Sequence, residues 1–233
     1  MKKLGIIGAM DIEVQTLKEQ MENLSVTEKA GTEYYEGTLL GLPAVLVKCG
    51  IGKVNAAIGT QILCDCFGIT HIVNTGIAGS LCAQQDIGDM VISSDVWHHD
   101  FDCNKFGYPM CQIPGMPQSF AADEAMIAMA KAAAEQVGGN VRIGRVASGD
   151  QFVADAQLKN QIIARTQALC TEMEGAAIAQ TAYRNGVPFV ILRCISDKAD
   201  NSAEMDYPSF EAMAAKRCAQ VTMTLAKQLT MEN

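Results

Sequence analysis

The sequence predicts an α/β fold in a single domain, residues 1–233, with a twisted, mostly parallel sheet flanked by helices. Short runs rich in Val and Ile alternate along the chain with segments whose apolar residues recur at helical spacing. That alternation is typical of a parallel sheet covered on both faces. The chain is 49% hydrophobic and 19% charged, so it can bury a sizeable core. No linker or low-complexity segment divides it.

The first half predicts four strands and two helices. The apolar run at 4–10 is a strand, and 33–50 gives two strands joined by a Gly-containing turn. A helix is expected over 53–67 and a strand over 70–76. The first helix is expected over 11–24, because one helical face collects Met10, Val14, Leu17, Met21 and Leu24.

The second half continues the alternation of strands and helices. The predicted strands are 88–100, 141–150, 168–174 and 187–197. The predicted helices are 120–137, the small-residue segment 175–183, and a long closing helix from about Pro208. Residues 98–119 are irregular and contain three prolines.

Charge and leader signals exclude several classes. A formal net charge of −8 does not suit a nucleic-acid-binding surface. The N-terminal apolar run is too short for a signal peptide and is interrupted by Asp11, and no stretch suits a membrane span. We expect a cytoplasmic protein.

Cysteine and histidine patterns do not indicate a metal site or disulfides. The nine cysteines are scattered, odd in number and without a CxxC pair. His98 and His99 are adjacent, so on a strand they point to opposite faces and make poor co-ligands.

Polar residues gather where the predicted strands end, which is where open α/β sheets bind ligands. Four acids stand at these ends, namely Glu13, Glu172, Glu174 and Asp197. Arg193 precedes Asp197 on the last strand and could join them. Each acid alone has a structural explanation as a helix cap or turn residue. Together, at consecutive strand ends, they favour a functional site.

The glycine-containing turns do not match a nucleotide-binding fingerprint. "GIGK" (50–53) lacks the spacing of a phosphate loop, and "TGIAGS" (75–80) is not GxGxxG. We expect both to form tight strand-to-helix turns and to allow close approach of the backbone.

Seven motifs in order resemble the 5′-methylthioadenosine/S-adenosylhomocysteine nucleosidases of the purine nucleoside phosphorylase-like superfamily. They are "GIIGAMDIEV", "CGIGKVNAA", "NTGIAGS", "HHDFD…FGYPMCQIPGMP", "SGDQFV", "TEMEGAAIA" and "RCISDKAD", spanning residues 5–200. The resemblance implies a nucleoside phosphorylase-like mixed sheet with a barrel-like curl, a homodimer, and no metal or organic cofactor. It also implies hydrolysis of the N-glycosidic bond, which releases adenine and the 5′-thioribose sugar.

The resemblance assigns site residues one by one. Glu13 corresponds to the acid that activates water, and Asp197, held by Ser196, to the acid that serves adenine N7. Met173 and Glu174 correspond to contacts of the ribose hydroxyls, with Arg193 nearby. The remaining substrate contacts are Phe152, Val153, Ala78 and Gly79 at the base, and Met10, Ile51 and Tyr207 around the sugar and 5′-group. Ile77 departs from the smaller or hydroxyl-bearing residue of many relatives. Glu172 has no assigned role.

Residue chemistry agrees with hydrolysis and ranks the rivals. Breaking an N-glycosidic bond through an oxocarbenium-like sugar needs a base for water and an acid for the leaving group. A phosphorylase would want arginines at strand ends, yet residues 1–100 contain none. A non-catalytic adenosine sensor would not need a water-activating acid, and a dehydrogenase would need the missing fingerprint. The choice among methylthioadenosine, S-adenosylhomocysteine, 5′-deoxyadenosine and aminofutalosine-type substrates stays open.

The irregular segment 103–117 is unusually apolar for a loop. It either folds back on its own core or forms a subunit interface, where aromatic residues and Met are enriched. The resemblance favours the interface, because Phe106 and Pro114 match positions that close the partner's 5′-substituent pocket.

Overall fold

The computed structural model describes residues 2–231, apart from the side chains of 204 and 205, and its centre is one sheet. The strands are β1 (Leu4–Gly8), β2 (Met21–Lys29), β3 (Thr32–Leu39), β4 (Leu42–Lys48), β5 (His71–Ser80), β6 (Met90–His98), β7 (Phe120–Ala121), β8 (Val141–Ser148), β9 (Cys170–Glu172) and β10 (Phe189–Asp197). The strand order β10-β6-β8-β9-β5-β1-β4-β3-β2 mixes parallel and antiparallel neighbours. The predicted α/β fold with a mixed sheet is confirmed, but the sheet is not mostly parallel, because the described strands make five parallel and five antiparallel pairings.

The sheet curls until it closes on itself. β5 pairs with β1 and β10 in parallel, and its last residues, Gly79 and Ser80, also pair with β9. Because β10 joins β6 and β9 joins β8, the strands β5, β10, β6, β8 and β9 form a closed ring. This is the barrel-like curl that the resemblance implied, and it brings distant strand ends together.

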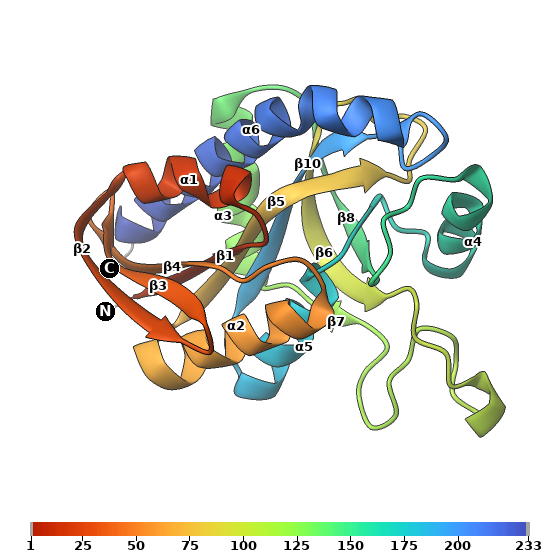
Figure 1. Ribbon diagram of the computed structural model, residues 1–233, viewed down its shortest axis with the longest axis horizontal. Coiled ribbons are helices and arrows are strands. Elements are labelled where there is room, and N and C mark those ends of the chain that lie inside the picture. The colour runs from red at the N-terminus through yellow and green to blue at the C-terminus, as the bar shows by residue number, and fades with distance from the viewer. Residues whose placement is uncertain (1, 232–233) are drawn as a thin grey trace.

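Helices cover both faces of the sheet (Figure 1). Figure 1 shows α1, α3 and α6 on one side and α2 and α5 on the other, with α4 at the end of the molecule. The bounds are α1 (Asp11–Glu19), α2 (Lys53–Phe67), α3 (Glu124–Val137), α4 (Ala156–Thr166), α5 (Gly175–Asn185) and α6 (Ala203–Met231), with a 3-10 turn η1 (Asn104–Phe106). Each layer buries its own apolar cluster against the sheet. No helix in the described part of the chain is long and apolar enough to cross a bilayer.

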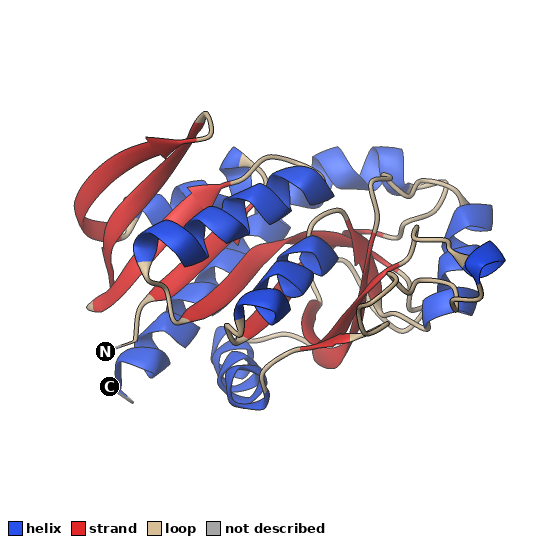
Figure 2. Cartoon of the chain, turned by 90° about the horizontal axis from the view of Figure 1, so that it is seen from below, coloured by secondary structure: helices blue, strands red, loops and turns tan. Residues whose placement is uncertain are grey.

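The first helix is shorter than predicted, and a strand follows it. α1 ends at Glu19, and residues 21–29 form β2 instead of the last helical turns. The helical match of Met21 and Leu24 was accidental, because pairing with β3 overrides it. β2 is a mostly exposed edge strand, so it lacks the apolar alternation that would reveal it in the sequence. Figure 2 shows the β2–β3 hairpin projecting from the body.

Several other predicted boundaries were wrong. Phe120 and Ala121 pair with β6, and α3 starts only at Glu124, after Asp123 caps it by accepting from the Met126 N–H at 2.9 Å. α4 was not predicted, because only two of its residues are buried. α6 begins at Ala203 rather than at Pro208, which lies inside the helix as its sixth residue and removes one N–H from its hydrogen-bond ladder.

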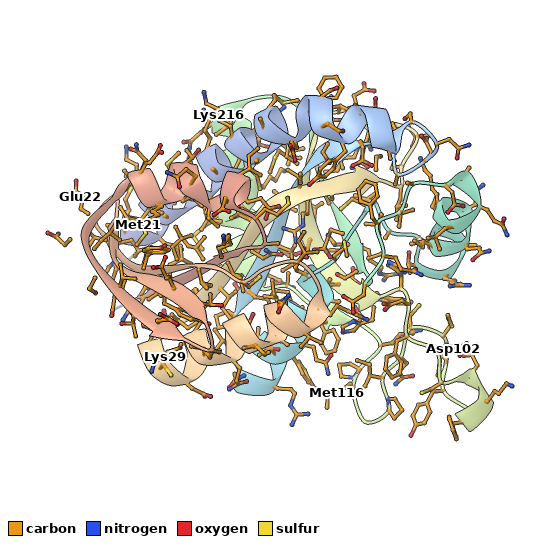
Figure 3. The ribbon with its side chains drawn as sticks, viewed as in Figure 1. Met21, Glu22, Lys29, Asp102, Met116 and Lys216 are labelled. Atoms are coloured by element: carbon orange, nitrogen blue, oxygen red, sulfur yellow. The ribbon has the colours of Figure 1, made fainter. Side chains whose placement is uncertain are left out.

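The irregular segment projects from the rest of the chain. Figure 3 labels Asp102 and Met116 on it, and Asp102 lies on the opposite side of the view from the two termini that Figure 1 marks. Cys111 is buried, but the Phe106 side chain is 81% exposed. The segment therefore does not fold back fully on its own core.

Candidate active site

A pocket of about 490 Å³ opens where β1, β5, β9 and β10 end. Ten of the residues expected as contacts line it together with the two expected catalytic acids. These are Met10, Glu13, Ile51, Ala78, Gly79, Phe152, Val153, Met173, Glu174, Ser196, Asp197 and Tyr207. The others are Ala9, Ile77, Gln151, Thr171 and Glu172. Ala9, Gln151 and Thr171 were missed, although Ala9 and Gln151 are chain neighbours of the expected contacts Met10 and Phe152.

Glu13 lies on one side of the pocket, in the first turn of α1. Its Oε2 accepts from the N–H groups of Ala9 at 2.7 Å and Met10 at 3.1 Å. Its Oε1 accepts from the N–H of Ile77 at 3.1 Å. Burial raises the pKa of Glu13, against the lowering effect of Arg193 and of these backbone donors. The carboxyl group is thus fixed in place, and its affinity for a proton is increased.

Asp197 ends β10 on the other side of the pocket and is 2% exposed. Its Oδ2 accepts from the Ser196 hydroxyl at 2.8 Å, and its Oδ1 from the Ala199 N–H at 2.8 Å. Burial raises the pKa of Asp197, and the hydrogen bonds from Ala199 and Ser196 oppose that rise. The raised pKa favours the protonated form of this carboxyl group, which can then donate a proton.

Two glycines of β5 make room for these acids. A methyl group on Gly76 would lie 2.5 Å from Glu13 Oε1 and 2.5 Å from Arg193 Nη1. One on Gly79 would lie 2.8 Å from Asp197 Oδ1. The motif "TGIAGS" lies inside β5, so the expectation of a strand-to-helix turn was wrong for it. The expected close approach to its backbone is present at Gly76 and Gly79. "GIGK" does lead from β4 into α2, with Gly52 as N-cap at φ +97°.

Glu172, Glu174 and Arg193 form a buried charge cluster behind and beside the pocket. Arg193 Nη2 donates to Glu172 Oε2 and, at 2.6 Å, to Asn74 Oδ1. It lies 3.7 Å from Glu174 Oε2. Burial opposes the change, but Arg193 and the hydrogen bond from Ser148 lower the pKa of Glu172. Burial, and then repulsion by Glu172, raise the pKa of Glu174 to about 8.

Aromatic side chains surround the pocket mouth. The rings of Phe152 and Tyr207 meet edge to face, with centroids 5.5 Å apart. The Tyr207 hydroxyl donates to Met10 Sδ at 3.3 Å, which ties the start of α6 to the end of β1. Phe152 remains 51% exposed, so its ring has free surface for a flat ligand.

Three expected contact residues do not line the pocket of their own chain. Arg193 lies behind it, 1% exposed, while Phe106 and Pro114 are exposed on the projecting segment. Within the described side chains, no group of three or more His, Cys, Asp or Glu is arranged to hold a metal ion.

A closed mixed sheet with acids at its strand ends places the chain in a known class. The family model described as "Phosphorylase superfamily" matches residues 3–227. A 5′-methylthioadenosine/S-adenosylhomocysteine nucleosidase of Halalkalibacterium halodurans is 44% identical over 230 residues, covering 98% of this chain and all of that protein. The chain therefore belongs to the phosphorylase superfamily and, within it, to the family of 5′-methylthioadenosine/S-adenosylhomocysteine nucleosidases.

Solved structures match over nearly the whole chain. The Neisseria meningitidis nucleosidase in complex with methylthio-immucillin-A superposes with a TM-score of 0.95 at 39% identity, covering 98% of this chain and 100% of that one. The Streptococcus pyogenes S-adenosylhomocysteine nucleosidase, in complex with 5-methylthiotubericidin, gives 0.95 at 35% identity, covering 98% and 97%.

Proposed function

We propose that this chain hydrolyses the N-glycosidic bond of 5′-methylthioadenosine and S-adenosylhomocysteine, releasing adenine and a 5′-thioribose sugar. The observation that carries the proposal is one apolar-walled pocket with a fixed carboxyl group on each side, Glu13 and Asp197. Both are anchored along β5, against Gly76 and Gly79.

Glu13 is the base for water in this proposal. Its Oε2 faces the end of β1 and its Oε1 faces β5, so the carboxylate is held by three backbone donors and cannot swing away. A water hydrogen-bonded to it can attack the anomeric carbon while Glu13 takes the proton. The raised pKa of Glu13 makes it a stronger base than an exposed carboxylate.

Asp197 is the acid for the leaving group. Adenine is a poor leaving group unless it gains a proton. A carboxyl group beside its five-membered ring can supply this proton at N7. Ser196 holds Oδ2 of Asp197, so the proton-bearing group keeps one orientation. Because the sugar passes through an oxocarbenium-like state, no side-chain nucleophile is required.

Contacts with the nucleoside divide between base and sugar. We assign the base to the exposed ring face of Phe152, the Val153 backbone, Ala78 and Gly79. The ribose hydroxyls fall to the Met173 backbone and Glu174. Met10, Ile51 and Tyr207 surround the 5′-substituent with apolar surface, which suits a thioether.

Water rather than phosphate is the nucleophile in this proposal. Among the described residues that line the pocket, none is Lys or Arg. Arg193, which lies behind the pocket wall, is committed to Glu172 and Asn74. A phosphorylase would need such cations free to clamp its anionic substrate.

Incubation with 5′-methylthioadenosine, with and without phosphate, tests this function. We expect adenine release at the same rate in both, with free methylthioribose as the sugar product. A ribose 1-phosphate product would make the chain a phosphorylase. 5′-Methylthioadenosine bound but left intact would make it a sensor.

We further propose that the protein is a cytoplasmic homodimer in which Phe106 and Pro114 of each chain complete the other chain's 5′-substituent pocket. The exposed apolar side chains of residues 103–117 support this, since such a segment is better placed at an interface than in water.

A further inference from the structure

Glu172 is an acid in the pocket wall with many hydrogen bonds and no assigned part in the reaction. Its Oε2 accepts from the N–H groups of Glu174 at 3.1 Å and Gly175 at 2.8 Å, as well as from Arg193. Its Oε1 accepts from the Ser148 hydroxyl. Both oxygens are therefore occupied by the protein itself, and Glu172 has little left to offer a ligand.

These bonds fix the turn that leads from β9 into α5. The first N–H groups of a helix have no partner within it and need one from outside. Glu172 serves the N–H groups of Glu174 and Gly175, and Ser148 serves that of Ala176 at 2.7 Å. The small residues that follow let α5 pack closely enough for this arrangement. The backbone of Met173 and Glu174 is thereby held rigidly at the pocket.

Glu172 also decides where the buried guanidinium group of Arg193 goes. Arg193 Nη2 contacts Glu172 and Asn74 but stays 3.7 Å from Glu174 Oε2. Asn74 is itself fixed, because its Nδ2 donates to the Ile7 carbonyl at 2.8 Å. The Glu174 side chain is instead held through Oε1, which accepts from the N–H of Gly52 at 2.8 Å.

We propose that Glu172 is a positioning residue. It pairs with the Arg193 guanidinium group and accepts from the N–H groups at the start of α5. The Glu174 carboxyl group is thereby left free to accept hydrogen bonds from the sugar hydroxyls. A carboxylate paired with a guanidinium is a weaker acceptor for a ligand, because its lone pairs are already engaged. This inference rests on the proposed function for its substrate, and its own evidence is the unequal sharing of Arg193.

The charges around Glu174 support the same reading. It is faced by Glu172 from β9, Arg193 from β10, Glu13 from α1 and Cys49 beyond β4. The pKa of Glu174 is about 8 because burial and the negative charge of Glu172 outweigh Arg193. Removing the charge of Glu172 should lower it, both directly and by freeing Arg193 to approach.

The test compares Glu172→Gln with Asp95→Asn. Asp95 is a matched control, since it is a part-buried carboxylate that accepts from Arg145 Nε at 2.7 Å and does not line the pocket. The first readout is the ratio of kcat/KM for 5′-methylthioadenosine to that for its 2′- and 3′-deoxy forms. We expect this ratio to fall at least about tenfold in Glu172→Gln, as for the loss of a charge-assisted hydrogen bond, and to be unchanged in Asp95→Asn.

The second readout does not need activity. Carboxyl ¹³C NMR of glutamate-labelled protein, with Glu174→Gln assigning the signal, follows the titration of Glu174. We expect its midpoint, near 8 in the native protein, to fall below about 7 in Glu172→Gln. If Glu172 only caps α5, the variant will lose thermal stability while the ratio and the midpoint stay unchanged, and that result would overturn the proposal.

Ser148→Ala, which keeps the charge of Glu172, tests the proposal if Glu172→Gln does not fold. Ser148→Ala removes one anchor of Glu172, so we expect the hydroxyl-discrimination ratio to fall several-fold while Glu174 still titrates above about 7. Full discrimination in folded Ser148→Ala would also overturn the proposal. Absence of adenine release by the native protein would instead defeat the proposed function and leave the NMR titration interpretable.

Discussion

At the scale of single residues, the two acids that face the pocket differ in how they are held. Glu13 is held by backbone donors, whereas Asp197 is held by one hydroxyl and one N–H. We expect Glu13→Gln and Asp197→Asn each to lower turnover at least about a hundredfold, as for loss of a positioned base or acid. Adenine release measured on folded protein checks this, with exposed Asp11→Asn as control. Near-native rates in either variant would contradict the roles.

The buried histidine His98 gives the fold a sensitivity to acid. Burial, and then repulsion from Lys53, lower its pKa to about 4, below the usual 6.5. Its contribution to stability is therefore complete above pH 6.5 and is lost as the pH falls toward 4. The loss amounts to about 3 kcal/mol, at about 1.36 kcal/mol per pH unit. We expect His98→Gln, which can keep a bond to Gln180, to flatten the fall in unfolding free energy between about pH 6.5 and 4.5 in urea titrations.

At the scale of elements, β5 contributes to the site through glycines, whose missing side chains leave space for the buried acids. Gly76→Ala would press a methyl group against both Glu13 and Arg193, and neither can withdraw because both are buried and bonded. We expect at least about a tenfold loss of kcat with modest loss of stability, because a small misplacement of a reacting group is costly. Gly68→Ala is the contrast: its methyl group meets open space at φ +60°, so thermal stability should fall while kcat stays native.

The acids of the site could be predicted from the sequence because elements of one sheet share an edge. Glu13 and Asp197 follow the apolar runs of β1 and β10, which both lie parallel to β5 and so end together. Glu174 follows the short strand β9, which is antiparallel to β5, and the closing of the sheet brings it to the same pocket. Glu172 could not be interpreted in this way, since its role depends on which side chain reaches Arg193. β2 was missed because an exposed edge strand has no buried face to mark it. α4 has only two buried residues, so its apolar pattern in the sequence is equally weak.

At the scale of the whole molecule, the segment that projects from one chain is expected to serve another. Phe106→Ala should raise KM for substrates with apolar 5′-thio groups several-fold and change kcat little, because an interaction that stabilises the ground and transition states equally affects KM alone. Steady-state kinetics measures the change in KM, and sedimentation measures whether the protein is a dimer. A fully active monomer, or an unmoved KM, would show that the segment acts only within its own chain.

Both ends of the described chain lie at one side of the molecule, opposite the projecting segment (Figures 1 and 2). Attachment through either terminus, to a resin or to a fused reporter, therefore keeps bulk away from residues 103–117. An immobilised form of this protein should keep its catalytic efficiency whichever terminus is used. A bulky label coupled near Asp102 should lower the catalytic efficiency.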